Sequence, residues 1–417
     1  MIQDILSLLE GLNDDLPVSI KLTDSVVLSQ VTEIADKIIE TASLYTEIVD
    51  VEKLISKQKE NFSLIIHLAI KLAKSKKALQ TINRKLHLSV VYAIYQEHQR
   101  MLSVKEHPFG EDLIMKKIEQ INWLFEGTTN FSWDMFIVDD GCPENSGKIA
   151  QKILDKQYKS DNVKVLFLKD AIEKRLPIVR DLRNANESRK GGSVEYGMWV
   201  ASQKEKPNHI ILYTDADLSI HLGQAGLLID KIINEENNAA IGSRWKESSI
   251  YYHQEKANPK DKLFVYLWKR LIPQINYIAD TGCSFKAFTV ENARKIISGT
   301  IAKQFAFDIE LLLKTEIFKH NSISEVAIAE IESRNTLIKD EQWPYVDKLK
   351  MIANLYYKYI PENDEGDNFA GFIENLTAES CNKLTENIPE PIKDGSPSEF
   401  KSYSGIKVSD FKAVIGN

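Results

Sequence analysis

The sequence predicts an α/β fold in which a mostly parallel sheet is flanked by helices and preceded by a helical extension. Two observations point to this class. Short and almost continuously apolar runs recur through the middle of the chain, which is typical of strands that are covered on both faces. Amphipathic segments separate these runs, as expected where helices connect parallel strands.

The N-terminal region, residues 1–85, has a helical pattern. Val31, Ile34 and Ile38 recur at steps of three and four residues, as the apolar face of an amphipathic helix requires. We interpret this region as a small helical packing unit, or as a surface for a homo-oligomer or another partner.

The middle region, residues 86–335, carries the expected strands. They cover residues 88–95, 135–139, 163–168, 209–214 and 239–243. In open parallel sheets, ligands bind beyond the carboxyl ends of the strands. The residues at those ends, Tyr95, Asp139, Asp140 and Asp215, are therefore the first candidates for a binding site.

The C-terminal region, residues 336–417, is predicted to contain one helix over 345–360. The remainder, 361–417, is rich in polar residues, proline and glycine. We expect most of it to be weakly ordered or peripheral.

Composition limits the classes of function. The 417 residues carry a net charge of -7, so no basic excess favours nucleic acid. Three widely spaced cysteines form neither a disulfide framework nor a zinc cluster, which fits a reducing, cytoplasmic setting. The acidic start does not resemble a signal peptide. The longest apolar run, residues 63–73, is too short to span a bilayer, so we expect at most peripheral membrane association.

Paired carboxylates follow one expected strand in "ILYTDADLSI", residues 211–220. Asp215 and Asp217 are two residues apart, so at an extended strand end their side chains point to the same side. Two neighbouring carboxylates repel each other unless a cation lies between them. Their oxygens favour Mg²⁺ or Mn²⁺, with phosphates and water completing the shell. The alternative is an Asx-type turn at a strand exit.

Other strand ends carry polar groups that also have plainer interpretations. Asp139 and Asp140 could accept hydrogen bonds from a base or ribose, or could belong to a turn that leads into a helix capped by Ser146 or Asn145. Lys190 and Gly191 precede a helix, where an anionic ligand would meet backbone N–H groups, although a plain junction has the same pattern. The planar fork of Arg244 suits a phosphate, and an ordinary surface arginine is the alternative.

The order of these motifs resembles the inverting family 2 glycosyltransferases, within them the dolichyl- or polyprenyl-phosphate glucosyl- and mannosyltransferase branch. "SVVYAIYQEHQRM" resembles the first strand and Tyr-Asn-Glu segment of that family, with Tyr95 and Glu97 in place. "VDDGCPENS", "KGGSVEYGM", "DADLS", "IGSR", "DTGCSFKAF" and "FAFDIELL" resemble its later elements in order, and "ISEVAI" resembles the strand after them.

The resemblance implies a GT-A (Rossmann-like) fold over residues 86–335 and a role for each matching residue. Asp139 or Asp140 would hold the base or ribose, and Lys190 and Gly191 would line the nucleotide pocket. Tyr95, Glu97 and Asp215 would complete the nucleotide-sugar site, and Asp215 and Asp217 would bind a divalent ion. Asp280 would face the acceptor, and Arg244 and Lys286 would contact the acceptor or a phosphate.

The implied activity is metal-dependent transfer of a hexose, with inversion, from a UDP- or GDP-sugar to an acceptor such as a polyprenyl phosphate. Asp280 would act as the base toward a hydroxyl, but would only position an acceptor that is already anionic. Two alternatives stay open. One is the same chemistry on a sugar, glycan or small-molecule hydroxyl, and the other is a non-catalytic nucleotide-sugar-binding scaffold. The sequence departs from the family pattern at several positions, among them Gln96, Cys142 and Arg189.

Overall fold

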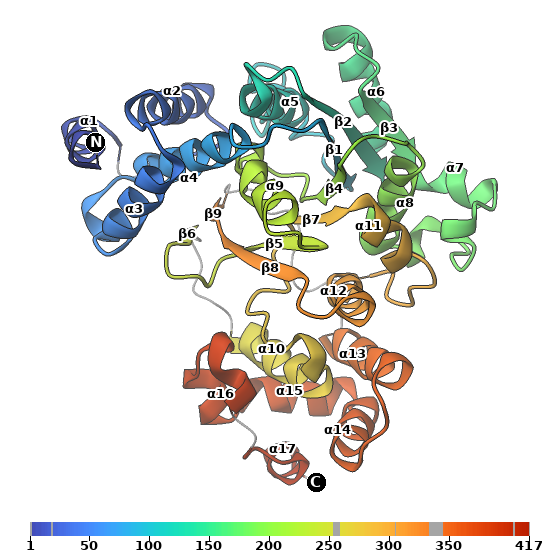
Figure 1. Cartoon of the computed structure of the whole chain (residues 1–417). Helices are drawn as coiled ribbons and strands as arrows, with labels where there is room; N and C mark the ends of the chain where they lie inside the picture. Colours follow the sequence, from blue (N-terminus) through green and yellow to red (C-terminus); the bar gives the residue numbers. More distant parts are fainter. Residues whose placement is uncertain are drawn as a thin grey trace.

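A seven-stranded sheet runs through the middle of the protein (Figure 1). The computed structural model describes residues 2–17, 20–252, 259–304, 306–332, 345–402 and 405–416. In spatial order the strands are β3 (Val163–Phe167), β2 (Phe131–Asp139), β1 (Leu86–Ile94), β4 (His209–Tyr213), β7 (Lys286–Thr289), β5 (Ala239–Ser243) and β8 (Ile323–Ala327).

The sheet is mostly parallel. Strand β7 alone runs antiparallel to both of its neighbours, β4 and β5, and the other described pairs are parallel. The expected α/β class and the five expected strands are therefore confirmed. A separate parallel pair is formed by β6 (Ile250–Tyr252) and β9 (Ala329–Ile331).

Helices surround the sheet. Before it come α1 (Ile2–Asn13), α2 (Ser25–Thr41), α3 (Tyr45–Ser56) and α4 (Leu64–Leu79). Between its strands lie α5 (Leu113–Phe125), α6 (Ser146–Gln157), α7 (Leu168–Glu173), α8 (Gly191–Ser202), α9 (Ala225–Ile233), α10 (Pro259–Leu271), α11 (Val290–Ile296) and α12 (Phe307–Phe318). After it come α13 (Tyr345–Tyr359), α14 (Asp364–Glu374), α15 (Ala378–Glu386), α16 (Glu390–Asp394) and α17 (Val408–Ile415).

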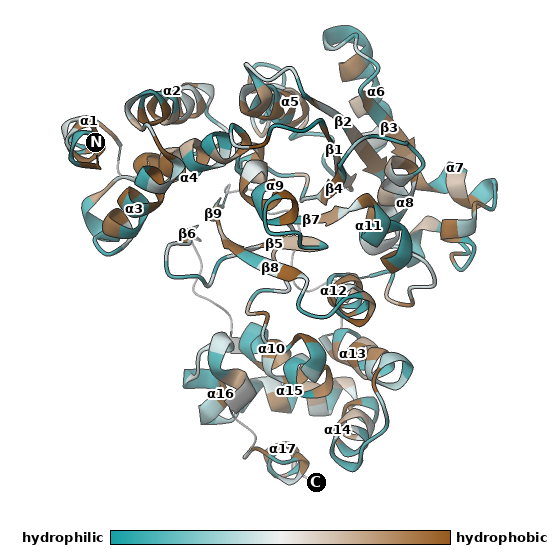
Figure 2. Cartoon of the chain, viewed as in Figure 1, coloured by the Kyte–Doolittle hydropathy of each residue, from teal (hydrophilic) through white to brown (hydrophobic). Residues whose placement is uncertain are grey.

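Two hydrophobic cores lie on opposite faces of the sheet. Neighbouring residues of a strand point to opposite faces, so Val90 belongs to one core and Val91 to the other. The first core includes Ile70 of α4 and the second includes Phe411 of α17. Figure 2 shows hydrophobic residues along strands such as β2 and β8, and both hydrophobic and hydrophilic residues on the surrounding helices.

The N-terminal helices are joined to the sheet rather than separate from it. Helix α4 packs against α2 and α3 on one side and α9 on the other. The buried Lys71 forms an ion pair with Glu52 of α3, and its Nζ donates to the Ala327 carbonyl oxygen at 3.1 Å. Lys59 Nζ donates to the Ser249 carbonyl oxygen at 2.8 Å. Both lysines thus connect the N-terminal region to chain segments that follow β5 and end β8.

The C-terminal region differs from the expected weakly ordered segment. Helix α13 covers nearly the predicted range, but four more helices follow it. Phe369, Phe372, Leu384 and Phe411 are buried in the second core. The polar residues between these positions hid the helical spacing of the apolar residues. The expected boundary at 335/336 lies outside the described residues.

No helix in the described part of the chain combines the length and the hydrophobicity that crossing a bilayer requires.

Candidate functional site

The candidate residues gather at one edge of the sheet. Parallel strands β1, β2, β4 and β5 end at this edge. Antiparallel β7 begins there, because its first residue, Lys286, pairs with Tyr213 on one side and Ile241 on the other. The residues that follow β1, β2, β4 and β5 and the loop that precedes β7 therefore lie together at this end of the sheet.

Asp215 pairs with Lys190 at this edge. Its Oδ1 accepts from Lys190 Nζ, which also donates to Ser284 Oγ at 2.8 Å. Burial raises the pKa of Asp215, but the Lys190 charge, hydrogen bonds from Lys190 and Ser284 and the Lys117 charge together outweigh burial and hold the pKa below its usual value. The Asp215 side chain is still 44% exposed, so a ligand can reach it.

Asp217 has a local partner. Its Oδ1 accepts from the Ser219 backbone N at 3.1 Å and from Ser219 Oγ at 2.6 Å. The Asx-type turn considered as an alternative is therefore present, but it uses one carboxylate oxygen only. A turn and a ligand site are compatible here, since Oδ2 is left outside the turn.

Further charges surround the two aspartates. Arg100 Nη1 lies 3.1 Å from Glu97 Oε2, and Arg100 Nε donates to Glu111 Oε2 at 3.0 Å. Burial, together with the Asp217 and Asp215 charges, raises the pKa of Glu97 to about 7 despite Arg100. The carboxylates that influence one another here are Glu97, Glu111, Asp215, Asp217, Asp280 and Glu330, and the cations are Arg100, Lys117, Lys190 and Arg244.

The donor set fits a hard divalent ion only with help from a substrate. Among the described residues, no group of three or more His, Cys, Asp or Glu side chains could hold a metal ion by itself. Asp215 and Asp217 offer two carboxylates, and Mg²⁺ commonly takes one or two carboxylates together with phosphate oxygens and water. The site thus matches an ion that arrives with a phosphate ligand.

Asp139 and Asp140 bind their own chain. Asp139 Oδ2 accepts from Gly147 N at 2.7 Å and its Oδ1 from Gly141 N at 3.0 Å, which fixes the start of α6. Asp140 Oδ1 accepts from Ser193 Oγ at 2.6 Å and its Oδ2 from Lys190 N at 2.7 Å. The turn of the alternative interpretation is therefore present at Asp139, whereas Asn145 takes the N-cap position of α6 without a side-chain hydrogen bond. A nucleotide contact from Asp139 or Asp140 stays a prediction.

The first position of α8, Gly191, requires glycine. A Cβ on Gly191 would lie 2.6 Å from the Lys303 carbonyl oxygen, and Gly192 N donates to the same oxygen at 3.0 Å. Lys190 just before it has φ +84°. This unusual backbone and the Asp140 hydrogen bond direct the Lys190 side chain toward Asp215.

Asp280 and Arg244 form a doubly hydrogen-bonded pair. Arg244 Nε donates to Asp280 Oδ2 at 2.8 Å, and Nη2 donates to Oδ1 at 2.7 Å. Burial raises the pKa of Asp280, but Arg244 outweighs it and lowers the pKa below the usual value. Arg244 Nη1 lies 3.6 Å from Glu330 Oε1 on β9.

One predicted residue, Lys286, takes a different position from the one expected. Lys286 is fully buried, with Nζ donating to Asp308 Oδ1 at 2.8 Å and to the Cys283 carbonyl oxygen. That position does not fit an acceptor or phosphate contact, because its charge is already neutralised inside the core. Tyr95, by contrast, is exposed beside Gln96, which has φ +57°.

Arg100, Lys117 and Glu330 were not among the predicted site residues. Arg100 stands three residues after Glu97, and Lys117 lies four residues after Leu113 and four before Ile121, on the buried face of α5. A lysine on that face is a usable signal. Glu330 has no such signal, since only the chain's return along β9 brings it to Arg244.

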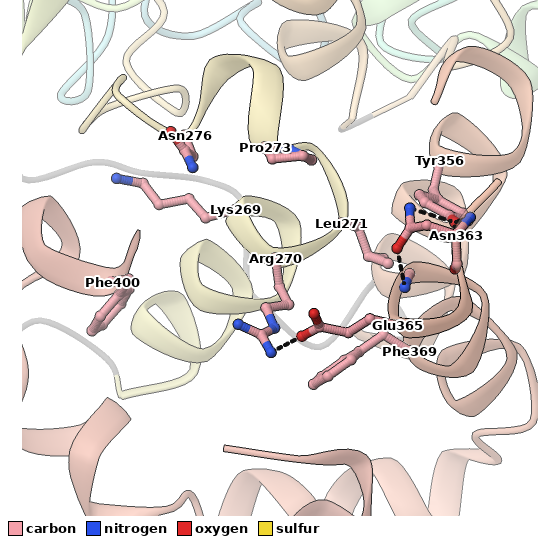
Figure 3. A pocket seen from close by; sticks show the side chains of 11 residues that line it. Lys269, Arg270, Leu271, Pro273, Asn276, Tyr356, Asn363, Glu365, Phe369 and Phe400 are labelled. Carbon is pink, nitrogen blue, oxygen red and sulfur yellow. Dashed lines mark hydrogen bonds and ion pairs between the residues drawn. The ribbon is translucent and has the colours of Figure 1, made fainter. Parts of the chain in front are cut away.

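A separate cavity of about 220 Å³ lies between α10 and the C-terminal helices (Figure 3). Arg270 and Glu365 form an ion pair there, beside Phe369. None of the predicted site residues lines it. The cavity therefore belongs to the packing of the C-terminal helices.

Several known glycosyltransferases are similar to this chain. The family model described as glycosyl transferase family 2 matches residues 118–291. Dolichyl-phosphate beta-glucosyltransferase of Homo sapiens is 29% identical over 285 residues, covering 65% of this chain and 75% of the relative. The Mus musculus protein of the same name is 28% identical over 295 residues, covering 66% and 82%.

Solved structures with some similarity include glucosyl-3-phosphoglycerate synthase from Mycobacterium tuberculosis, at 15% identity and a TM-score of 0.46. The match covers 70% of this chain and 86% of that chain. This low score adds nothing to the family assignment, which depends on sequence. The matched family model and the similarity to dolichyl-phosphate glucosyltransferases show that the chain is a glycosyltransferase that is similar to family 2 and, within it, to the polyprenyl-phosphate branch.

Proposed function

We propose that this enzyme moves a hexose, with inversion, from a nucleoside diphosphate sugar to a polyprenyl phosphate, with Mg²⁺ or Mn²⁺ at Asp215 and Asp217. The observation that carries the proposal is the charge around this pair. Asp215 and Asp217 lie among the further carboxylates Glu97, Glu111, Asp280 and Glu330, and a divalent ion could join the two aspartates to the phosphates of a donor. The names of the human and mouse relatives support glucose as the hexose and a polyprenyl phosphate as the acceptor.

Lys190 and the paired aspartates would bind the donor. Lys190 Nζ donates to Asp215 Oδ1 and would contact a diphosphate bound at the same end of the sheet. A bound divalent ion would stabilise negative charge on the departing nucleoside diphosphate. Tyr95, Glu97, Asp139, Asp140 and Gly191 are proposed as the rest of the nucleotide-sugar site.

The state of Asp280 favours a phosphate acceptor. A general base needs an available lone pair and a pKa near the working pH. Asp280 is 2% exposed, both of its oxygens accept from Arg244, and its pKa is lowered. A phosphate oxygen is already anionic and needs no base, whereas a hydroxyl acceptor would. Arg244 Nη1 is not used in the Asp280 pair and would contact that phosphate.

The acceptor also bears on location. A polyprenyl chain is held in a bilayer, so we propose peripheral association of this chain with the cytoplasmic face of a membrane. Residues 86–335 are proposed as the transferase domain.

The test is an assay of purified protein with UDP-glucose and other UDP- or GDP-sugars, each with Mn²⁺ or Mg²⁺ and with short-chain polyprenyl phosphate in detergent. Transfer to the phosphate that requires the metal and is lost in Asp217→Asn supports the proposal. Transfer only to sugar or alcohol hydroxyls would show that the acceptor is a hydroxyl and not a polyprenyl phosphate. Donor binding without transfer to any acceptor would favour the scaffold alternative, and no binding of any nucleotide sugar would refute the proposal.

A further inference from the structure

We infer that Lys117 is a fixed internal counter-charge for Asp217 and Asp215, which makes binding of the divalent ion depend on simultaneous binding of a nucleoside diphosphate. The inference rests on the proposed function and gives a positioning role to a residue outside the family motifs quoted above.

Lys117 is an unusual buried cation. Its side chain is fully buried, and Nζ has no hydrogen-bond partner among the described residues. Lys117 Nζ lies over the Tyr92 ring, 5.3 Å from the ring centroid. A buried ammonium without hydrogen bonds is costly, and a cation–π contact offsets only part of that cost. Such a charge is expected where an electrostatic role requires it.

The other buried lysines in the described part of the chain have polar partners. Lys71, Lys286 and Lys303 form ion pairs with Glu52, Asp308 and Glu195. The Nζ atoms of Lys116 and Lys269 donate to the backbone carbonyl oxygens of Thr23 and Pro397. Lys117 has no carboxylate in contact, yet the opposing charges that act on it most are Asp217 and Asp215. Burial nevertheless lowers the pKa of Lys117 to about 8, and these aspartates counteract that effect.

Helix α5 holds Lys117 in place relative to Asp217. One turn along the same face, Gln120 Oε1 accepts from Leu222 N at 2.9 Å, in the chain segment that follows Asp217. Helix α5 also packs on the short 3-10 helix at Leu222–Gln224. Lys117 therefore cannot leave the aspartates without moving a packed helix.

Lys190 is the movable counterpart of Lys117. Its side chain is 29% exposed, and its Nζ can leave Asp215 for the phosphates of a donor. In the unliganded protein, the ammonium groups of Lys117 and Lys190 thus balance the charges of Asp215 and Asp217, so a divalent ion would bind there only weakly. When a diphosphate arrives, its negative charges attract Lys190, and the two aspartates together with the phosphates then offer the ion a strongly negative site.

The expected property is strong coupling between ion and nucleotide. Coupling is reciprocal, so UDP should tighten Mn²⁺ binding by the same factor by which Mn²⁺ tightens UDP binding. If Lys117 sets the low affinity for the ion alone, removing its charge should raise that affinity and reduce the coupling.

The experiment measures Mn²⁺ and UDP binding to the full chain by calorimetry, and free Mn²⁺ by electron paramagnetic resonance, for wild type, Lys117→Met and Lys117→Arg. For Lys117→Met we expect Mn²⁺ alone to bind about tenfold more tightly, as expected for loss of one nearby charge. The coupling factor should fall by a similar ratio. Lys117→Arg keeps the charge and should resemble wild type.

Lys71→Met is the matched control, because Lys71 is equally buried but lies in the N-terminal region. It should leave Mn²⁺ affinity unchanged. Unchanged or weaker binding of Mn²⁺ alone in Lys117→Met, with Mn²⁺–UDP binding retained, would overturn the inference. If Lys117→Met does not fold, Lys117→Gln takes its place with the same expectations. If wild type binds neither UDP nor GDP with Mn²⁺ or Mg²⁺, the proposed function itself fails, which is a different result.

Discussion

Arg244 and Asp280 hold each other through two parallel hydrogen bonds, of 2.8 Å from Nε and 2.7 Å from Nη2, at the exit of β5. The Arg244 backbone N also donates to Asp280 Oδ2, at 2.9 Å. The two residues are 36 positions apart in sequence, so this pair joins the β5 exit to the loop before β7.

The pair should behave as one functional unit. Asp280→Asn and Arg244→Met should each lower kcat/KM by about 100-fold, because either change releases the partner from its position. The double variant should be no worse than the poorer single variant. A double-mutant cycle of kcat/KM measures this, and additive losses would show that the residues act separately.

Removing the Asp217 carboxylate should abolish the effect of the metal ion on UDP binding. Asp217→Asn keeps the shape and the Ser219 turn but removes the charge, so activity should fall by about 100-fold or more. UDP binding should no longer respond to Mn²⁺. The measurement is calorimetric UDP binding with and without Mn²⁺, and a preserved Mn²⁺ effect would contradict the assignment.

Glu330 should make stability depend on pH. Burial and the Asp280 charge raise its pKa to about 7 from the ordinary 4.5, despite Arg244. The folded protein therefore keeps a proton that the unfolded chain releases between these two values. The free energy of unfolding should fall as pH rises from about 4.5 to 7, by on the order of 1–3 kcal/mol from this group.

Urea unfolding of wild type and Glu330→Gln without added metal, at pH 5, 6, 7 and 8, tests this expectation. The variant should show a smaller decrease between pH 5 and 7.5. Parallel curves for the two proteins would mean that Glu330 does not titrate in this range.

Gly191 should not tolerate a side chain. Alanine there would place Cβ 2.6 Å from the Lys303 carbonyl oxygen and 2.9 Å from Phe307 Cβ. We expect Gly191→Ala to lower the free energy of unfolding by about 1–3 kcal/mol and to weaken donor binding. Gly11→Ala in α1 is the control, since nothing lies within 4 Å of its Cβ and alanine favours a helix. Equal stability of the two variants would contradict the prediction.

The N-terminal region should be stabilised by its buried ion pair. Glu52→Ala leaves the buried Lys71 without its carboxylate, and we expect a loss of about 3 kcal/mol in unfolding free energy. Asp50→Asn breaks the exposed Asp50–Lys53 pair of the same helix, α3, and should change stability by less than about 0.5 kcal/mol. Similar effects for both variants in denaturant unfolding would contradict the prediction.

Much of the fold follows from local pattern. All five expected strands form. Strands β1, β4 and β5 and the second half of β2 are apolar and buried on both faces, so their sequence indicates their environment directly, whereas β3 lies at the sheet edge and is partly exposed. Strand β7 is four residues long and pairs with β4 and β5, which no local pattern predicts. The C-terminal helices were missed because burial of Phe369 and Phe411 depends on α10 and α13, not on composition.

The site was predictable where chemistry is local. Asp215, Asp217 and Lys190 were identified from strand ends and a helix start, and the structure brings Asp215 and Lys190 into contact. The turn at Asp139 was weighed as an alternative and is present. The hydrogen bond from Gly147 N at the start of α6 to Asp139 was not predicted, and the burial of Lys286 depends on Asp308 from another helix. Glu330 reaches Arg244 through tertiary structure alone.

The C-terminal helices have a practical consequence for shortening the chain. The buried Glu310 of α12 accepts from Tyr359 of α13 at 2.6 Å and from the Ala302 backbone N at 2.7 Å. Ending the chain at 335 would leave that carboxylate without its tyrosine and would uncover the apolar side of α10. A protein cut there is expected to aggregate on expression, so the smallest soluble unit should extend to α17.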